Sequence, residues 1–297
     1  MTPAETASAG AATRLVPVTP ERHGSRFWRR FASWEFVRAH RAVPIVLGEH
    51  EQVAASLPIV FMRTGAGLWP VALTRLTDRG TCALVSPGGQ WRGSYVPSIL
   101  RVHPFGARRN EAGDLGLLVD ETSGLVTDDP DDEPFFTPDG TPAPALGEVI
   151  DFFQKRAAAE TKTRAAMAEI VARAAPVPFS APDAVGQMDV EGLFVPDRAR
   201  IDGLGRTDLG ALHRCGALAL LQVQAVSLHH LPFLAAAEAQ LDQAPRQGRD
   251  TAPASPATAP GDDALSGFLD ALADSRVRDT GDATSTDDEK SDDVSKP

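Results

Sequence analysis

The apolar residues of this chain change their spacing about halfway along its 297 residues. In the first half they form short runs, such as residues 57–65, 68–77 and 81–86, that are bounded by Gly, Pro or Asp. Such runs predict an antiparallel meander of short strands. In the second half they recur every three or four positions, which predicts helices. Strands first and helices after predict an α+β fold: an antiparallel β-rich N-terminal half followed by packed helices.

Two long helices are predicted in the second half. The first spans residues 146–174, with Thr161 as a point where it could break in two. The second runs from residue 207 to residue 230 and has few charges after Arg214, which predicts a central position in the core. Pro232 then kinks or ends it. Before these helices, residues 113–126 predict one more hairpin, with Glu121–Gly124 as its turn.

Composition divides the chain into three parts. Residues 1–13 contain too few bulky side chains to pack, and we predict a disordered leader. Residues 14–243 are enough for a single globular domain with its own core. Residues 244–297 contain 12 acidic and 6 basic residues, so they carry −6 of the net charge of −11. We predict that this acidic tail is disordered.

Within the tail, residues 262–275 predict a short amphipathic helix. Four apolar residues share one face at spacings i, i+3, i+4 and i+7: Leu265, Phe268, Leu269 and Leu272. Such a helix is too short to be stable alone in water. Two interpretations stay open: a docking helix that folds on a partner or on its own domain, or a chance cluster of leucines in a disordered tail.

Charge and motifs exclude several classes of function. A net charge of −11 argues against binding to nucleic acid, which needs a basic face. No uninterrupted apolar run reaches the roughly 18 residues of a membrane span, so we expect no membrane insertion. The start lacks the features of a secretory signal, which predicts a cytoplasmic protein. Phosphate-loop, dinucleotide-binding, nucleophile-elbow and zinc-protease motifs are absent from the sequence, and we expect no cofactor and no metal.

Aromatic and basic residues concentrate in residues 86–109. One interpretation is a concave site in which Arg101 holds an anionic group and Trp91 and Tyr95 form flat apolar walls. The other is a structural crossing, in which the Tyr95 hydroxyl and Arg101 bond to backbone carbonyls beneath a loop. The residues alone leave both open.

The same segment resembles the hallmark of the SapC family of bacterial proteins, W-x-x-x-Y-V-P-x-x-L-R-x-x-P-F. The matching positions are Trp91, Tyr95, Val96, Pro97, Leu100, Arg101, Pro104 and Phe105. Upstream, Glu49 followed by LPIVF is similar to another element of the family; downstream, LLVDE (which contains Asp120), PFFTPDGTPAP and EGLFVPD are similar too. The resemblance covers about residues 30–240. His103 departs from it, since the family usually has an aromatic residue before this proline.

The resemblance implies a function only in outline, since the family is named after a component associated with bacterial surface-layer protein and its transport. It implies a non-enzymatic cytosolic accessory protein that binds a protein or peptide client. Surface and envelope proteins are among the clients that the resemblance implies. The candidate binding residues are Trp91, Tyr95, Pro97, Arg101, Phe105, Glu49 and Asp120. The alternative is an enzyme of unrecognised type that modifies a peptide or small metabolite at this segment, with Arg101 as anion clamp and Glu49 or Asp120 as acid/base.

Overall fold

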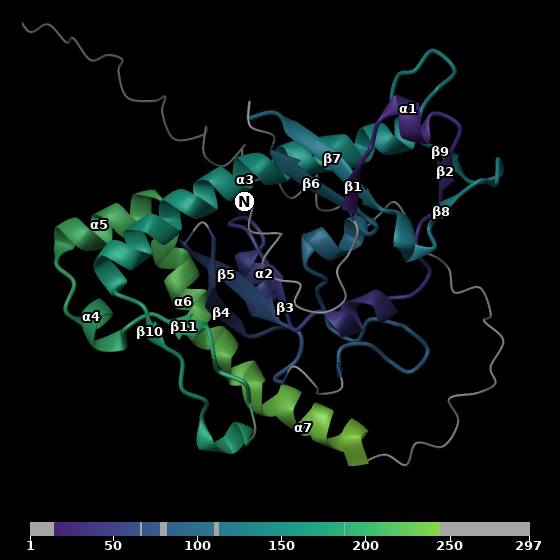
Figure 1. The fold of residues 1–297 in the computed structure, drawn as a ribbon. Helices are drawn as coiled ribbons and strands as arrows, with labels where there is room; N and C mark the ends of the chain where they lie inside the picture. Colours follow the sequence, from purple (N-terminus) through teal and green to yellow (C-terminus); the bar gives the residue numbers. More distant parts are fainter. Residues whose placement is uncertain (1–14, 66, 78–81, 110–112, 187, 244–297) are drawn as a thin grey trace, which may run out of the picture. The chain divides into compact units, whose positions relative to one another are not determined.

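A computed structural model describes residues 15–65, 67–77, 82–109, 113–186 and 188–243 (Figure 1). All of them belong to one compact unit, Met1–Ala257. The predicted leader lies outside the described residues, and so does the tail with its predicted helix at 262–275.

The largest sheet has five antiparallel strands in the order β10-β11-β4-β5-β3. At its centre is a hairpin of β4 and β5, in which Val60 lies opposite Val71. The strands are β3 (Ala42–Pro44), β4 (Ile59–Thr64), β5 (Gly67–Leu73), β10 (Val177–Pro178) and β11 (Leu193–Val195). Because β10 and β11 come from the second half of the chain, the two halves share this sheet.

Two three-stranded antiparallel sheets contain the remaining strands, in the orders β1-β7-β6 and β8-β2-β9. The first comprises β1 (Leu15–Pro17), β6 (Phe105–Arg109) and β7 (Leu115–Asp120), and the second comprises β2 (Phe27–Trp28), β8 (Val126–Thr127) and β9 (Glu133–Pro134). The hairpin predicted within residues 113–126 is wrong, because β7 pairs with β1 and β6 whereas β8 pairs with β2. Its turn is present, with Gly124 at φ 74°.

The strand predicted at residues 81–86 is also wrong. Of the described part of that run, only Val85 forms a β-bridge, to Trp91. The backbone folds back at once, because Ser86 N–H donates to Gln90 O at 2.8 Å and Arg92 N–H donates to Leu84 O at 2.8 Å. These bonds shape a tight loop and hold the beginning of the 91–105 segment.

Helices dominate the second half, which confirms the α+β class. The α-helices are α1 (Pro20–His23), α2 (His50–Ala54), α3 (Pro144–Ala174), α4 (Arg198–Asp202), α5 (Arg206–Arg214), α6 (Ala217–Ser227) and α7 (Leu231–Gln243). Short 3-10 turns are η2 (Glu35–Ala39), η3 (Ser98–Val102), η4 (Glu121–Ser123), η5 (Asp183–Val185) and η6 (Leu228–His230).

Helix α3 continues past Thr161 without the break considered from the sequence. The hydroxyl of Thr161 donates to Ala157 O at 3.1 Å, and that of Thr163 donates to Ala159 O at 2.8 Å. Because each hydroxyl bonds to the carbonyl one turn earlier, the threonines stay within the helix instead of capping a new one.

The second predicted helix is divided where Gly216 adopts φ +75°, a left-handed conformation that glycine reaches without strain. This separates α5 from α6. Pro232 does not end the run: α6 is followed directly by the 3-10 turn η6 and then by α7, of which Pro232 is the second residue.

Both faces of the β4–β5 hairpin are buried. Successive strand residues point to opposite faces, so Val60 packs with α7 residues Leu231 and Leu234, whereas Phe61 packs with α3 and α6. This two-sided burial explains why residues 57–61 form a continuous apolar run rather than an alternating one.

The docking of α7 should depend on pH through Glu238. This buried carboxylate accepts the N–H of Leu76 at 3.1 Å. Burial and then repulsion by Asp242 raise the pKa of Glu238 to about 7, against the opposing effects of that hydrogen bond and of Arg75. The pKa of Glu238 is therefore higher in the folded protein than in the unfolded chain. The contribution of Glu238 to the free energy of unfolding is complete below about pH 4.5 and is lost as pH rises through 7.

We therefore expect Glu238→Gln to lose less stability than wild type between pH 5 and pH 8. Urea unfolding midpoints at several pH values measure this difference. Parallel pH profiles for the two proteins would contradict the assignment.

Candidate functional site

The 91–105 segment lies against two parts of the core. It begins at the bridge of Trp91 to Val85, passes through η3 and enters β6 at Phe105. Trp91 and Tyr95 pack on an apolar cluster that joins α2 to the β4–β5 hairpin. The segment is therefore part of the folded interior along one side, and its polar groups must find partners there.

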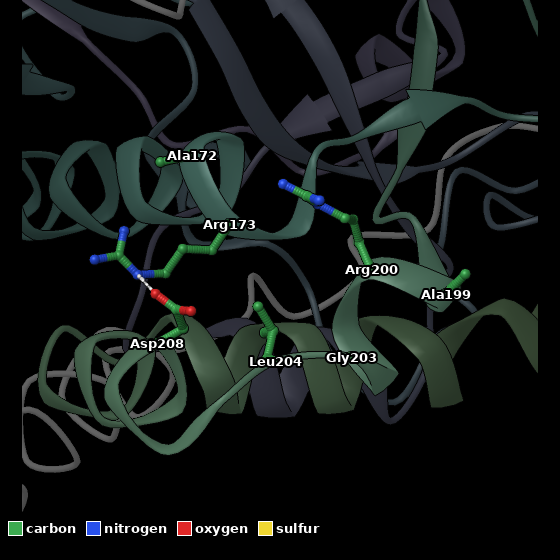
Figure 2. A pocket seen from close by; sticks show the side chains of 7 residues that line it. All are labelled: Ala172, Arg173, Ala199, Arg200, Gly203, Leu204 and Asp208. Atoms are coloured by element: carbon green, nitrogen blue, oxygen red, sulfur yellow. Dashed lines mark ion pairs between the residues drawn. The ribbon is translucent and has the colours of Figure 1, made fainter.

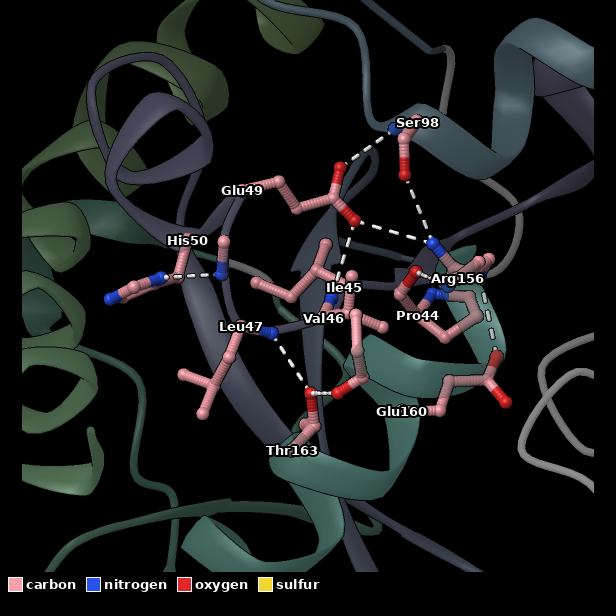
Figure 3. Close-up of polar contacts among 12 residues, drawn as sticks. Pro44, Ile45, Val46, Leu47, Glu49, His50, Ser98, Arg156, Glu160 and Thr163 are labelled. Atoms are coloured by element: carbon pink, nitrogen blue, oxygen red, sulfur yellow. Dashed lines mark hydrogen bonds and ion pairs between the residues drawn. The ribbon is translucent and has the colours of Figure 1, made fainter. Parts of the chain in front are cut away.

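Glu49 is the centre of those polar contacts (Figure 3). Its side chain, directly before α2, is 0% exposed. One carboxylate oxygen accepts the N–H of Ser98 at 2.8 Å and the hydroxyl of Tyr95 at 3.1 Å. The other accepts the N–H of Val46 at 3.2 Å. The buried charge is thus held by donors from two segments 49 positions apart.

Arg156 supplies the opposite charge from the middle of α3. Its guanidinium lies 3.4 Å from Glu49 Oε1 and donates to Ser98 Oγ and to Pro44 O, each at 3.0 Å (Figure 3). On the same helix, Glu160 lies 3.4 Å from its Nε. Sequence reasoning missed Arg156, although an arginine on the buried face of a helix, between Phe153 and Ala157, is a signal for a buried ion pair.

Tyr95 joins this network through its hydroxyl, and Arg101 lies over the Tyr95 ring. Burial, and next the Glu49 carboxylate, raise the pKa of Tyr95 far above its usual range, so the hydroxyl remains a donor. The Arg101 guanidinium lies 4.7 Å from the centre of the Tyr95 ring and donates twice to Val96 O, at 3.0 and 2.7 Å. Arg101 thus bonds to a backbone carbonyl, as the structural crossing predicted, whereas the Tyr95 hydroxyl bonds to the Glu49 carboxylate instead.

The other predicted site residues divide between this network and other places. Trp91 donates its indole N–H to Tyr95 O at 3.1 Å, and Pro97 is buried at the start of η3. Phe105 instead packs edge-on against Trp28, with ring centres 4.8 Å apart. Asp120 caps η4 by accepting from Thr122. The four predicted docking-helix residues at 265–272 lie outside the described residues.

The outer side of the segment carries a group of partly buried apolar side chains, which we call the aromatic rim. Its members come from residues 34–36 and from the segment: Trp34, Phe36, Trp91, Val96 and Ile99. The rings of Trp34 and Trp91 lie 6.0 Å apart, and those of Trp34 and Phe36 lie 5.9 Å apart. The rim residues pack on a buried cluster that includes Val37, Val85 and Leu100, and each of them stays partly exposed.

His103 borders the rim without acting as a charged group near neutral pH. Its ring stacks on Phe36 at 3.9 Å. Burial lowers the pKa of His103 to about 4, although Asp120 opposes the shift. His103 therefore extends the aromatic rim as a neutral ring.

A pocket of about 350 Å³ lies elsewhere, between α3, α4 and α5 (Figure 2). Within it Arg173 pairs with Asp208 at 3.2 Å, and Arg200 extends across the opening. None of the predicted site residues lines it. Among the described residues, no three His, Cys, Asp or Glu side chains gather as a metal site would require.

Comparison with known proteins gives one match. The sequence model of the SapC family, described as SapC, matches residues 18–234. The match includes Glu49, the 91–105 segment and Arg156. No curated protein and no solved structure matches the chain.

The ion pair should be essential to the fold. Replacing Arg156 with Met leaves a buried Glu49 carboxylate without its counter-charge, which costs about 3 kcal/mol of unfolding free energy. The double variant Glu49→Gln/Arg156→Met should recover part of this loss, because the buried charge is gone. Urea unfolding of wild type, Arg156→Met and the double variant measures these differences.

Lys155→Met, at an exposed position on the same helix, is the control and should change stability by less than about 0.5 kcal/mol. Equal losses at positions 155 and 156 would contradict the assignment.

The hydroxyl of Tyr95 should contribute separately. Tyr95→Phe keeps the ring beneath Arg101 but removes one donor to Glu49, so we expect a loss of about 1–3 kcal/mol in unfolding free energy. The same substitution made in Glu49→Gln should cost less, because the acceptor is then uncharged. Additive losses would show that the hydroxyl and the carboxylate act independently.

Proposed function

The chain belongs to the SapC family, and on that premise we propose that it is a non-enzymatic accessory protein in the cytoplasm that binds a protein or peptide client of the cell surface or envelope. The observation that carries the proposal is the division of the 91–105 segment. The Tyr95 hydroxyl and Ser98 turn inward to Glu49 and Arg156, whereas three apolar side chains of the segment, Trp91, Val96 and Ile99, belong to the aromatic rim. A segment arranged in this way offers contact area rather than reactive groups.

Flat aromatic side chains suit the recognition of apolar or proline-containing peptide. They supply large contact area with few rotatable bonds, so little conformational entropy is lost on binding. Three of the five rim residues are aromatic, and Trp34 and Trp91 come from separate parts of the chain. Because the loop bonds around Trp91 and the Glu49 network hold the segment, we propose that the rim is preorganised for its client.

The enzymatic alternative has less support from the same contacts. Arg101, its anion clamp, donates twice to Val96 O, and Glu49, its acid/base, accepts from three donors besides Arg156. Asp120, the other acid/base, is engaged with Thr122. We therefore rank the binding function first.

Affinity capture with quantitative mass spectrometry tests the proposal. Wild type, Trp34→Ala and Phe194→Ala are immobilised as full chains and exposed to native lysate. Phe194 is the matched control, because it is a partly buried aromatic residue on β11, away from the rim. We expect one or more secreted or envelope proteins to be retained by wild type and by Phe194→Ala, and to fall at least about tenfold with Trp34→Ala. Equal retention by all three proteins, or no specific retention by wild type, would overturn the proposal.

A further inference from the structure

The outward face of α6 and α7 lacks charge. Between Cys215 and Leu241 the sequence contains a single Asp, Glu, Lys or Arg, namely Glu238, and that side chain is buried against Leu76. The solvent face of a surface helix is ordinarily charged or strongly polar. Helix α3 in the same protein follows that rule, since Glu148 and Lys155 are among its exposed residues. The face of α6–α7 therefore calls for an explanation other than solvation.

The core explains only one side of this run. Ala217–Asp242 is long and apolar enough, by length and composition, to cross a bilayer, and 39% of its most apolar window is buried. The buried side includes Leu231 and Leu234, which pack with β4 and β5. The sequence predicted a central helix, but the structure leaves one of its faces open, with Val226 65% and Phe233 74% exposed.

The open face follows a regular pattern. Six exposed residues, none of them Asp, Glu, Lys or Arg, are spaced 4, 3, 4, 3 and 4 positions apart: Gln222, Val226, His229, Phe233, Ala236 and Gln240. This spacing is typical of the contact line between two helices that pack side by side. We call these six residues the seam. Its centre is apolar or aromatic, and each end is a glutamine.

We propose that the seam is a contact surface for a second copy of this chain, with the two helices antiparallel. A two-fold axis near residue 231 pairs each seam residue with another of the same set. Phe233 of one copy then lies against His229 of the other, and Val226 lies against Ala236. Each large side chain meets a smaller or flat one, and the two end glutamines pair through their amides. The seam is therefore complementary to itself.

The seam lets two copies meet in spite of their net charge. Each chain carries −11, so two copies repel each other wherever their charged surfaces meet. The seam is free of Asp, Glu, Lys and Arg, and its neighbours Ala225, Pro232 and Ala239 are uncharged as well. A charged partner would find no oppositely charged side chain along the seam. An apolar contact between identical chains does not require charged side chains.

The size of the seam sets the expected strength. The seam runs along α6, the 3-10 turn η6 and α7, and its eighteen residue steps span roughly 27 Å. One pair of helical runs of that length buries less area than a standard stable interface. We therefore expect a reversible dimer of micromolar or weaker affinity. No seam residue belongs to the aromatic rim, so the inference does not depend on the proposed function.

Sedimentation velocity of the full chain tests the dimer between about 1 and 300 µM. We expect the mean mass to rise from the monomer value of 31.5 kDa with concentration, and to rise further in higher salt, which screens the repulsion between like charges. Phe233→Asp should weaken the dimer at least about tenfold. The matched control is Val171→Asp, which adds the same charge at a residue 48% exposed on α3 and should leave the mass unchanged from wild type.

Cross-linking tests the antiparallel arrangement. In the full-chain variant Val226→Cys/Ala236→Cys, the two positions lie roughly 15 Å apart along one helix, too far for a disulfide within a chain. We expect mild oxidation to produce a dimer whose disulfide joins position 226 of one copy to position 236 of the other. Peptide mapping identifies the bond.

Three results would overturn the proposal. The first is a wild type that remains monomeric at every concentration. The second is a dimer that Phe233→Asp leaves as strong as wild type, when circular dichroism shows that the variant is folded. The third is a cross-link between like positions, 226 to 226, which would require parallel helices.

Discussion

The buried carboxylate of Glu49 is the contact on which the arrangement of this protein depends. It lies between the loop before α2, the 91–105 segment and the middle of α3, and each of these contributes a donor to it. An isolated carboxylate would be costly in such a place, so the three parts have to come together for the charge to be tolerated. The hydrophobic cores on either side can accept many side chains of similar volume. The ion pair can accept only one relative placement of its donors.

This constraint also shapes the surface of the 91–105 segment. Tyr95 and Ser98 are directed to internal partners, whereas Arg92 and Ser94 of the same segment are exposed. The aromatic rim lies between these two groups in exposure, because its members are partly buried. The open face of α6–α7 has a different origin, because its uncharged residues make no contribution to the core and its buried side is already complete. Two apolar surfaces on one acidic chain suggest two separate contacts with other molecules.

Much of the secondary structure could be read from local patterns. The β4–β5 hairpin follows from β-branched residues on both sides of the glycines at 65 and 67. Helix α3 follows from helical spacing that starts at Leu146 and stops before Pro176. The errors came where pairing or position is decided at long range. β7 was expected to pair with the strand that follows it, but the strands before it, β1 and β6, occupy both its edges.

The candidate site shows the same difference between what local sequence predicts and what long-range contacts decide. The segment and the importance of Glu49, Tyr95 and Arg101 could be recognised from the sequence, because their spacing resembles a family pattern. Their roles could not, since a carboxylate, a phenol and a guanidinium serve equally well in a binding site or in a buried network. The partner that settles the matter, Arg156, lies 107 positions from Glu49.

The sequence by itself therefore determined the α+β class, the family, the acidic balance and the chemical types at the site, because these depend on residues near one another in the chain. Only the tertiary structure decided which groups are buried, which strands pair and which helix face is left open. Those outcomes depend on burial and on hydrogen bonding between distant segments, and a charge or an apolar face has no fixed role until its neighbours in space are known.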